Sequence, residues 1–477
     1  MIAERATQAA IAANRFGFGA RPGELAAASS DPRAWLLASL RSPYRVPAEL
    51  DGLASGREIL ATFLAARAAH AAQKKAIARE AASDGSADTA LVDGIREQLL
   101  PHYLAQAVAR TRIALANESS FRERLVHFWS NHFAVSVDKP ICLGTAGALE
   151  NEAIRPRIDG HFSDLLLAVE THPAMITYLD NERSAGPHSE LGVRAARRQR
   201  EPEQGKVGLN ENLAREILEL HTLGVDGGYA QSDVTAFAAV ITGWSIGGGR
   251  GPWAQGEPGD FVFRDALHEP GAKRVLRRRY ADGGLSQGRA VLRDLAANPA
   301  TARHLATRLA RHFVADDPPA TLVDRLARIY GASDGHLPSV YEALVSSEAA
   351  WQPELQKFKQ PCEFVYSALR ALEAAPEQPM ALLAPFDILG QRHWSPGSPA
   401  GWPDRQADWN GADALMKRIE WSVALADRSG DSRPATAAAG AALGPLATAH
   451  TLKTLEGAAS ASQALTLLLM SPEFQRR

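Results

Sequence analysis

Residues 210–224 read NENLAREILELHTLG and concentrate five ionisable side chains and two amides in about four helical turns. On a helix that turns about 100° per residue, Asn212, Glu216 and Glu219 share one face, and apolar side chains fill the opposite arc. Apolar residues keep this helical spacing through most of the chain, in which alanine, leucine, arginine and glutamate dominate. The sequence therefore predicts an all-α fold, built as a large multi-helix assembly.

The chain is 477 residues long, and we expect one helical domain over all of it. Its expected sub-parts are N-terminal helical hairpins (1–118), a motif-bearing core (119–280) and C-terminal helices (281–477). A polar, basic stretch at 183–208 is predicted to be a long loop. Residues 260–277 are predicted to form one small β-hairpin insertion, which pairs Phe261–Phe263 with Arg274–Leu276.

The composition is ordinary for a globular protein, with 45% hydrophobic and 22% charged residues and a formal net charge of -2. Arginine clusters at 194–200 and 273–279 are expected to be solvated faces, because no nucleic-acid-binding motif accompanies them. We therefore expect no nucleic-acid partner. No window approaches the roughly twenty apolar residues of a membrane span. The first residues lack the apolar stretch of a signal peptide, which predicts a cytoplasmic protein and leaves export open.

Cys142 and Cys362 have neither metal-ligand spacing nor a catalytic signature. Each is expected to be a small buried hydrophobic residue, and a disulfide between them is left open. The sequence also contains no Walker phosphate loop, no Gly-x-Ser-x-Gly elbow and no His-Glu-x-x-His helix. The enzyme classes that depend on those motifs are therefore not indicated.

Two accounts of residues 210–224 remain open. In both, His221 projects from the apolar arc and is predicted to be buried. In the first, a backbone carbonyl satisfies His221, and Glu211 and Arg215 form part of a surface charge ladder. In the second, Glu216 and Asn212 face a partly dry cavity, where a carboxylate with a raised pKa can act as a general acid or base.

A second polar cluster lies in residues 121–133, FRERLVHFWSNHF. On a helix, Arg124, His127 and Asn131 form a polar stripe that faces a surface or a groove. His132 falls among apolar and aromatic side chains, so we expect it to belong to the core. The two clusters together predict a pocket between helices.

The leading hypothesis is an enzyme with acid/base or hydrolytic chemistry on an unidentified small or anionic substrate. Its candidate residues are Glu216 for proton transfer with the Asn212 amide beside it, His127 and Asn131 for substrate orientation, Arg215 or His268 for an anionic group, and His221 in the same cluster. His268 flanks the predicted hairpin turn and has no obvious packing duty. Glu216 and Glu219 supply too few oxygen ligands for a cation, so no metal site is expected, and no cofactor is indicated.

The alternative hypothesis is a helical scaffold or adaptor that binds a partner protein. Residues 393–409 carry three tryptophans and three prolines with little periodicity, and are predicted to form an aromatic-rich surface loop. Aromatic side chains are enriched at protein interfaces, so this loop would be the contact surface. The 210–224 cluster would then be a buried structural network.

Several stretches resemble a bacterial family known only as domain of unknown function 1800. They are NRFGFG (14–19), FWSNHF (128–133), HPAMITYLD (172–180), residues 210–224, GGYAQSDV (227–234), TGW (242–244), HEPGAK (268–273) and SPEFQ (471–475). The resemblance extends over nearly the whole chain. It implies a shared fold and motif set without an activity. It also implies a partnership with proteins resembling alkaline phosphatases and sulfatases, which are often encoded beside this family, and some members look exported.

Overall fold

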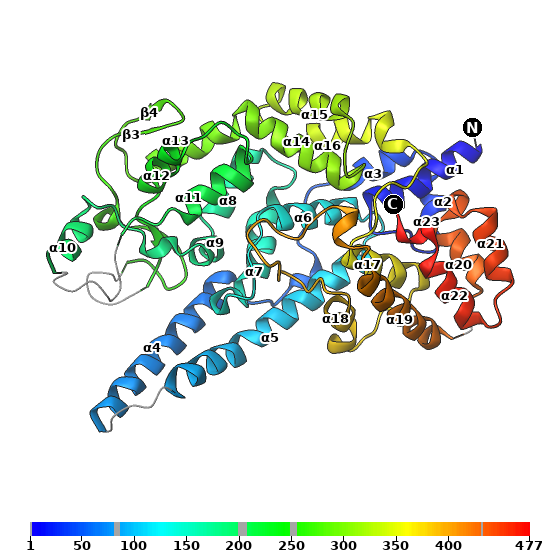
Figure 1. Ribbon diagram of the computed structural model, residues 1–477, viewed down its shortest axis with the longest axis horizontal. Coiled ribbons are helices and arrows are strands. Elements are labelled where there is room, and N and C mark those ends of the chain that lie inside the picture. Colours follow the sequence, from blue (N-terminus) through cyan, green and yellow to red (C-terminus); the bar gives the residue numbers. More distant parts are fainter. Residues whose placement is uncertain (1, 81–85, 199–207, 249–254, 431–432) are drawn as a thin grey trace.

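The protein is an elongated assembly of helices, seen in a computed structural model that describes residues 2–80, 86–198, 208–248, 255–430 and 433–477 (Figure 1). Both chain termini lie toward the same end of the long axis. The predicted all-α fold with a minor β part is confirmed, because helices form nearly all of the regular structure.

The N-terminal helices are α1 (Ile2–Ile11), α2 (Glu24–Ala28), α3 (Pro32–Arg41), α4 (Gly56–Glu80) and α5 (Ser86–Ala116). Helix α3 begins where Asp31 accepts a hydrogen bond from the Ala34 amide and proline occupies the first turn. Helices α4 and α5 pack against each other and project from the body as a long hairpin (Figure 1). This pair of helices lies within residues 1–118, where helical hairpins were expected.

The central helices are α6 (Phe121–His132), α7 (Thr145–Ala148), α8 (Phe162–Glu170), α9 (Pro173–Tyr178), α10 (Glu190–Arg198), α11 (Asn212–Glu216) and α12 (Gln231–Val240). Helix α10 lies inside the stretch predicted to be a long loop. The loop prediction is thus wrong for the part that α10 occupies, and residues 199–207 lie outside the described residues.

Three helical segments have the wide π-helical turn, namely η1 (Ala12–Phe16), η4 (Leu149–Ile154) and η7 (Ile217–Thr222). In η7 the Leu223 amide donates to the Leu218 carbonyl over 3.0 Å, five residues back. Because each such turn holds an extra residue, the regular wheel assumed for residues 210–224 fails beyond Glu216. Rare π-helical turns are frequent at functional sites, and η4 carries a buried carboxylate of the site below.

The remaining α-helices build the upper edge and the end that holds the termini (Figure 1). They are α13 (Leu285–Ala296), α14 (Pro299–Phe313), α15 (Ala320–Ala332), α16 (Leu337–Val345), α17 (Pro361–Leu372), α18 (Pro379–Ile388), α19 (Ala412–Ser429), α20 (Ala435–Ala442), α21 (Ala449–Glu456), α22 (Ala461–Met470) and α23 (Pro472–Gln475). Short 3-10 turns connect several elements: η2 (Ala48–Leu50), η3 (Pro140–Cys142), η5 (Arg155–Arg157), η6 (Asn181–Arg183), η9 (Asp265–Leu267), η10 (Glu348–Trp351), η11 (Gln406–Asp408) and η12 (Gly444–Leu446).

The strands form two small antiparallel sheets instead of the single predicted hairpin. Strand β1 (Trp244–Ile246) pairs with β2 (Phe261–Phe263), and β3 (Lys273–Val275) pairs with β4 (Arg278–Tyr280). The predicted pairing of Phe261–Phe263 with Arg274–Leu276 is therefore wrong. Leu276 and Arg277 both have positive φ, 48° and 66°, and close a two-residue turn within the second sheet. A turn of this type ordinarily carries asparagine or glycine, so Leu276 and Arg277 do not predict it.

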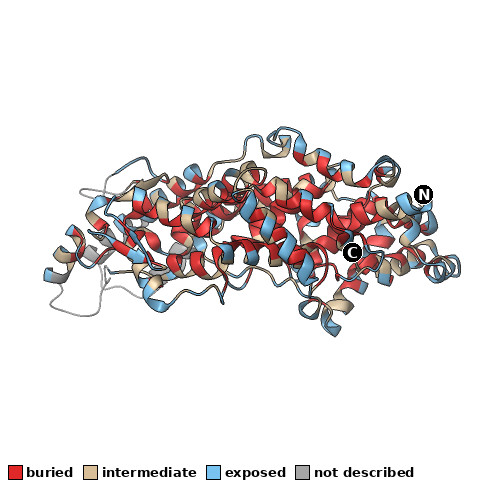
Figure 2. Cartoon of the chain, turned by 90° about the horizontal axis from the view of Figure 1, so that it is seen from above, coloured by how far each residue is buried: buried red, intermediate tan, exposed pale blue. Residues whose placement is uncertain are grey.

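Buried residues form a continuous band along the long axis (Figure 2). A single cluster of buried apolar side chains joins elements from α1 to α23. Cys142 is buried as expected, Cys362 is half-buried, and both thiols are free, so the disulfide left open does not form. Within the described residues, none of the helices combines the length and hydrophobicity needed to cross a membrane.

Candidate functional site

Helix α6 lies at the centre of the molecule (Figure 1). It presents a polar stripe to a cavity. Most of the helix is buried, because its apolar side chains pack on several sides. Arg124, His127 and Asn131 all line the cavity, as the sequence predicted for these three residues. The helix spacing alone placed them on one face.

The cavity lies between α6, α14, α17 and the segment 391–404. Its volume is about 60 Å³, which is room for a few water molecules or a small ligand. It is lined by Phe18, Arg110, Arg124, His127, Phe128, Ser130, Asn131, Ala134, Val135, Arg308, His312, Gln360, Cys362, Glu363, Gln391, Arg392, His393, Trp394, Pro396, Trp402 and Asp404. Four arginines and two carboxylates thus share one wall, which favours negatively charged ligands.

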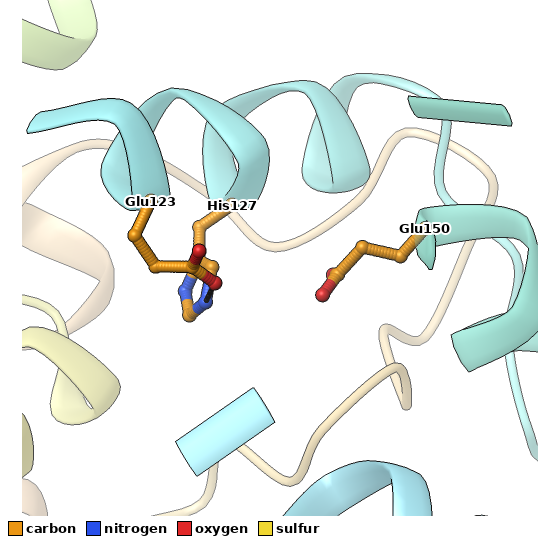
Figure 3. Close-up of side chains that lie close together, drawn as sticks. All are labelled: Glu123, His127 and Glu150. Carbon is orange, nitrogen blue, oxygen red and sulfur yellow. Dashed lines mark ion pairs between the residues drawn. The ribbon is translucent and has the colours of Figure 1, made fainter. Parts of the chain in front are cut away.

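Glu123 and His127 form a dyad on adjacent turns of α6 (Figure 3). His127 Nε2 lies 3.4 Å from Glu123 Oε1, and the imidazole is only 9% exposed. Burial alone would raise the pKa of Glu123, but Arg155 bonds both of its oxygens and holds that pKa far below the ordinary value. Burial also lowers the pKa of His127, assisted by the charge of Arg110. At neutral pH the dyad therefore joins an ionised carboxylate to a neutral imidazole.

Glu150 reaches toward the dyad from the π-helical turn η4 (Figure 3). Its carboxylate accepts hydrogen bonds from Arg110 Nε at 2.9 Å and from Trp394 Nε1 at 3.0 Å. Potential ligand atoms of Glu123, His127 and Glu150 lie within 4.8 Å of one another, so these residues could hold a metal ion. Arg110 and Arg155 already neutralise the two carboxylates, which favours an ion-pair network over a cation site.

A second group of ion pairs closes the far side of the cavity. Glu363 pairs with Arg124 and Arg477, and Arg124 is almost fully buried. His312 Nδ1 lies 3.3 Å from Asp404, and burial lowers the pKa of His312 to about 4. These groups are held in fixed positions, because each charge that leaves water has a partner of opposite sign.

Arg308 differs from the other arginines of the wall. It projects from α14 four residues before His312, so both side chains lie on one helix face. Among the described residues it has no hydrogen-bond or ion-pair partner. Burial lowers its pKa, which the more distant Asp404 charge opposes.

Asn131 holds the segment 393–409 against α6 instead of facing the cavity with a free amide. Its Nδ2 donates to the Trp402 carbonyl at 2.9 Å, and its Oδ1 accepts from the Trp402 amide at 2.7 Å. Trp394 and Trp409 are buried. The segment is an irregular loop with several exposed residues, as predicted, but two of its three tryptophans are packed into the body and do not form an exposed aromatic surface.

His221 and His132 are buried, as predicted, and bring the two motif segments into contact. His132 Nε2 donates to the His221 carbonyl at 3.1 Å. The His221 ring itself pairs with Glu170, at 2.8 Å, rather than with a backbone carbonyl. His304 of α14 donates to the neighbouring Leu220 carbonyl at 3.1 Å. The segments therefore meet through a buried histidine network and not across the cavity.

The other predicted residues of the 210–224 segment lie outside the cavity wall. Asn212 is exposed, and Arg215 pairs with Glu211 at 3.0 Å, as in the surface-ladder account. Glu216 is half-buried, and burial raises its pKa as the enzyme hypothesis requires. The cavity lining contains none of Asn212, Arg215, Glu216 and His221.

His268 has a packing role that the sequence did not reveal. It is buried, its Nδ1 donates to the Thr242 carbonyl at 3.0 Å, and its ring contacts Phe263. Burial lowers its pKa. It lies outside the cavity wall, because it belongs to the part of the chain that carries the two small sheets.

Sequence reasoning missed most of the charged groups around the cavity. They are Arg110, Glu123, Glu150, Arg155, Arg308, His312, Glu363, Arg392, His393 and Asp404. One signal for these residues was available in the sequence. His304, Arg308 and His312 are spaced four residues apart on α14, which places three polar side chains along one helix face.

One protein-family model, described as Protein of unknown function (DUF1800), matches residues 11–476. The match includes every residue of the cavity wall, so the site lies wholly within the region shared by the family. No curated protein and no solved structure matches the chain.

Proposed function

The chain belongs to this family, whose description carries no activity, and we propose that it is an enzyme that performs acid/base or hydrolytic chemistry on a small molecule in the cavity beside α6. His127 is the proposed proton acceptor, with Glu123 as the residue that positions it. The observation that carries the proposal is a buried, neutral imidazole, oriented by an ionised carboxylate, in the wall of a cavity rich in arginine.

The dyad explains how a proton would move. Glu123 favours the tautomer of His127 that carries its proton on Nε2, because the negative oxygen lies beside that nitrogen. Nδ1 is then unprotonated and can take a proton from a substrate or from a water molecule in the cavity. The imidazolium that forms is stabilised by the charge of Glu123.

The arginines of the cavity wall supply the positive charge that stabilises the negative charge formed in the reaction. When a proton leaves the substrate, its electron pair stays behind as negative charge, which fixed guanidinium groups stabilise in a site largely closed to water. If the proton comes from water, the resulting hydroxide attacks the substrate, and the same cations stabilise the oxygen that becomes negative. The bond to the leaving group then breaks, and the protonated His127 returns its proton to that group. Both routes use the same residues, so the proposal covers acid/base and hydrolytic chemistry together.

We assign Asn131 to the positioning of residues 393–409, because both atoms of its amide are bonded to Trp402. Glu216, Asn212, Arg215, His221 and His268 receive no part in this chemistry, since they lie outside the cavity wall.

A turnover screen tests the proposal. Purified wild-type protein is assayed against small esters, lactones, phosphate esters and hydroxy acids, beside His127→Gln and the exposed control His450→Gln. We expect turnover by wild type and His450→Gln, and a loss of at least about a hundredfold in His127→Gln. The rate should rise with pH through a pKa below 6.5, since desolvation keeps His127 neutral. A folded His127→Gln variant with wild-type turnover would remove His127 from the mechanism.

The scaffold alternative has one feature in its favour. Met416, Ile419 and Val423 are exposed on one face of α19, and Met380 and Ile388 are exposed on the neighbouring α18. Such a face suits a partner helix. The alternative predicts that Ile419→Glu abolishes the capture of a specific partner and that no substrate is turned over. Turnover of a substrate that is lost in His127→Gln would support the enzyme hypothesis over the scaffold hypothesis.

A further inference from the structure

The cations of the cavity wall divide into those that already have a counter-charge and one that has none. Arg110 pairs with Glu150 at 2.9 Å and Arg392 with Asp138 at 3.1 Å. Arg124 pairs with Glu363. Arg308 has no such partner in the described part of the chain.

An unpaired guanidinium in this position requires an explanation. Arg308 is partly buried in the cavity wall, and burial disfavours its charged form and so lowers its pKa. Its five N–H donors need acceptors, because polar groups that leave water without a partner raise the free energy of the folded state. Long surface arginines usually find such acceptors in bulk water, but Arg308 is enclosed by α14, α6 and residues 391–404.

Other donors without partners face or border the same space. The buried Arg124 Nε, in the cavity wall, has no hydrogen bond among the described residues. Ser130 lines the cavity, and its hydroxyl has no partner in the described part of the chain. Unused donors around one cation form a site for an acceptor that carries negative charge.

The balance of charges in the cavity wall also favours a negatively charged ligand. Both wall carboxylates, Glu363 and Asp404, are themselves paired with cations. Neither is available to neutralise Arg308 at hydrogen-bond distance. The cavity therefore carries excess positive charge with His127, His312 and His393 neutral, as the lowered pKa of each indicates.

We propose that Arg308 is the centre of an anion subsite that binds the carboxylate or phosphate group of a small ligand. This inference rests on the proposed function, in which the same ligand presents its reactive proton to His127. A volume of about 60 Å³ restricts the bound group to the size of phosphate or a short-chain carboxylate. Arg308 donates two parallel hydrogen bonds to two oxygens of the anion, the geometry that a guanidinium offers and a lysine does not.

Binding of simple anions tests the subsite. Inorganic phosphate, sulfate, acetate and oxalate are titrated into wild type, Arg308→Gln, Arg308→Lys and Arg303→Gln by calorimetry. Arg303 is the matched control, since it lies on the same helix, 63% exposed and paired with Asp324. We expect phosphate or oxalate to bind wild type and the control equally, Arg308→Gln to bind at least about tenfold more weakly, and Arg308→Lys to fall between them.

The melting temperature in anion-free buffer separates a binding role from a structural one. Removing an uncompensated charge should leave the melting temperature of Arg308→Gln unchanged or raise it. A lowered melting temperature would mean that Arg308 supports the fold, and would overturn the assignment. So would wild type that binds none of the four anions, or Arg308→Gln that binds them as wild type does.

The subsite and the proposed chemistry fail in different ways. If phosphate binding depends on Arg308 but wild type turns over nothing in the screen, the subsite stands and the proposed activity falls. If turnover depends on His127 but anion binding is unaffected by Arg308→Gln, the activity stands and the subsite falls.

Discussion

At the scale of single residues, the site depends on charges that hold one another in place. Arg155 bonds Glu123 directly and lies 3.4 Å from Glu150, so one guanidinium keeps two buried carboxylates ionised. Glu123 in turn is the residue that we propose to position His127, with Oε1 3.4 Å from Nε2. The imidazole is therefore positioned by a residue that never touches the cavity, which is typical of groups that support a catalytic side chain.

Replacing Arg155 by methionine should destabilise the protein strongly. The substitution leaves Glu123 buried and without its cation, which costs about 3 to 5 kcal/mol. Urea unfolding measures this, with Arg303→Met as the control, because an exposed ion pair contributes only about 0 to 1 kcal/mol. Equal losses in the two variants would show that the buried network does not hold Glu123 ionised.

The sequence identified part of the site at this scale. The spacing of Arg124, His127 and Asn131 predicted one polar face, and the cavity lies there. Arg308 comes from a helix far along the chain, and only tertiary packing brings it beside His127. The prediction of Glu216 as the proton-transfer group rested on the local density of polar residues. That density is the same whether the polar side chains form ion pairs on the helix surface or line a cavity.

At the scale of elements, α6 and the segment 393–409 form the two sides of the cavity entrance. Gly401 lies so close to α6 that a Cβ atom there would sit 2.3 Å from the Asn131 carbonyl oxygen, and its φ is +81°. The close approach lets Asn131 bond the Trp402 backbone twice. Glycine is therefore required at this position for both space and conformation.

Gly401→Ala should loosen the segment. The left-handed backbone and the clash with α6 together cost about 1 to 3 kcal/mol. Hydrogen exchange of residues 395–405 should become faster, and anion binding in the cavity weaker. Gly397→Ala is the control, because no atom lies within 4 Å of the Cβ position there and its φ is not positive. Unchanged exchange in Gly401→Ala would mean that the Asn131 contact does not hold the segment.

Elements with a regular pattern were predictable, and those set by distant contacts were not. The helical spacing of apolar residues predicted helical hairpins in the N-terminal part of the chain, where α4 and α5 lie. The strand pairs could not be assigned, because fourteen residues separate β2 from its partner β1 along the chain, and the β3–β4 turn uses Leu276 and Arg277. The π-helical turn of η7 likewise follows from tertiary packing, since its residues suit an α-helix equally well.

At the scale of the whole molecule, many histidines are buried in a continuous core. Burial lowers the pKa of six of them: His127, His132, His268, His304, His312 and His393. The values for His304 and His312 are about 4. Each stays neutral in the folded protein at a pH where the unfolded chain, with an ordinary value of about 6.5, already binds a proton.

The free energy of unfolding should therefore fall as the pH drops from about 6.5 toward 4, because the unfolded state binds more protons in this range. Between about pH 7 and pH 5 we expect a loss of roughly 3 kcal/mol or more, measured by urea unfolding. The lowered pKa values of Glu123, Glu363 and Asp404 add their own loss only below about pH 4, where unfolded carboxylates become protonated. Stability that is flat or higher at pH 5 would contradict the neutral state of the histidines.

The most direct measurement is the ¹⁵N NMR titration of the histidine rings, with the His127 signal assigned by its absence in His127→Gln. The protonation of this one imidazole underlies the proposed chemistry. We predict a neutral ring at about pH 7.5 with the proton on Nε2, a pKa below 6.5, and a shift of the Nδ1 signal when phosphate is added. A ring that is doubly protonated at that pH, or that carries its proton on Nδ1, would contradict the account.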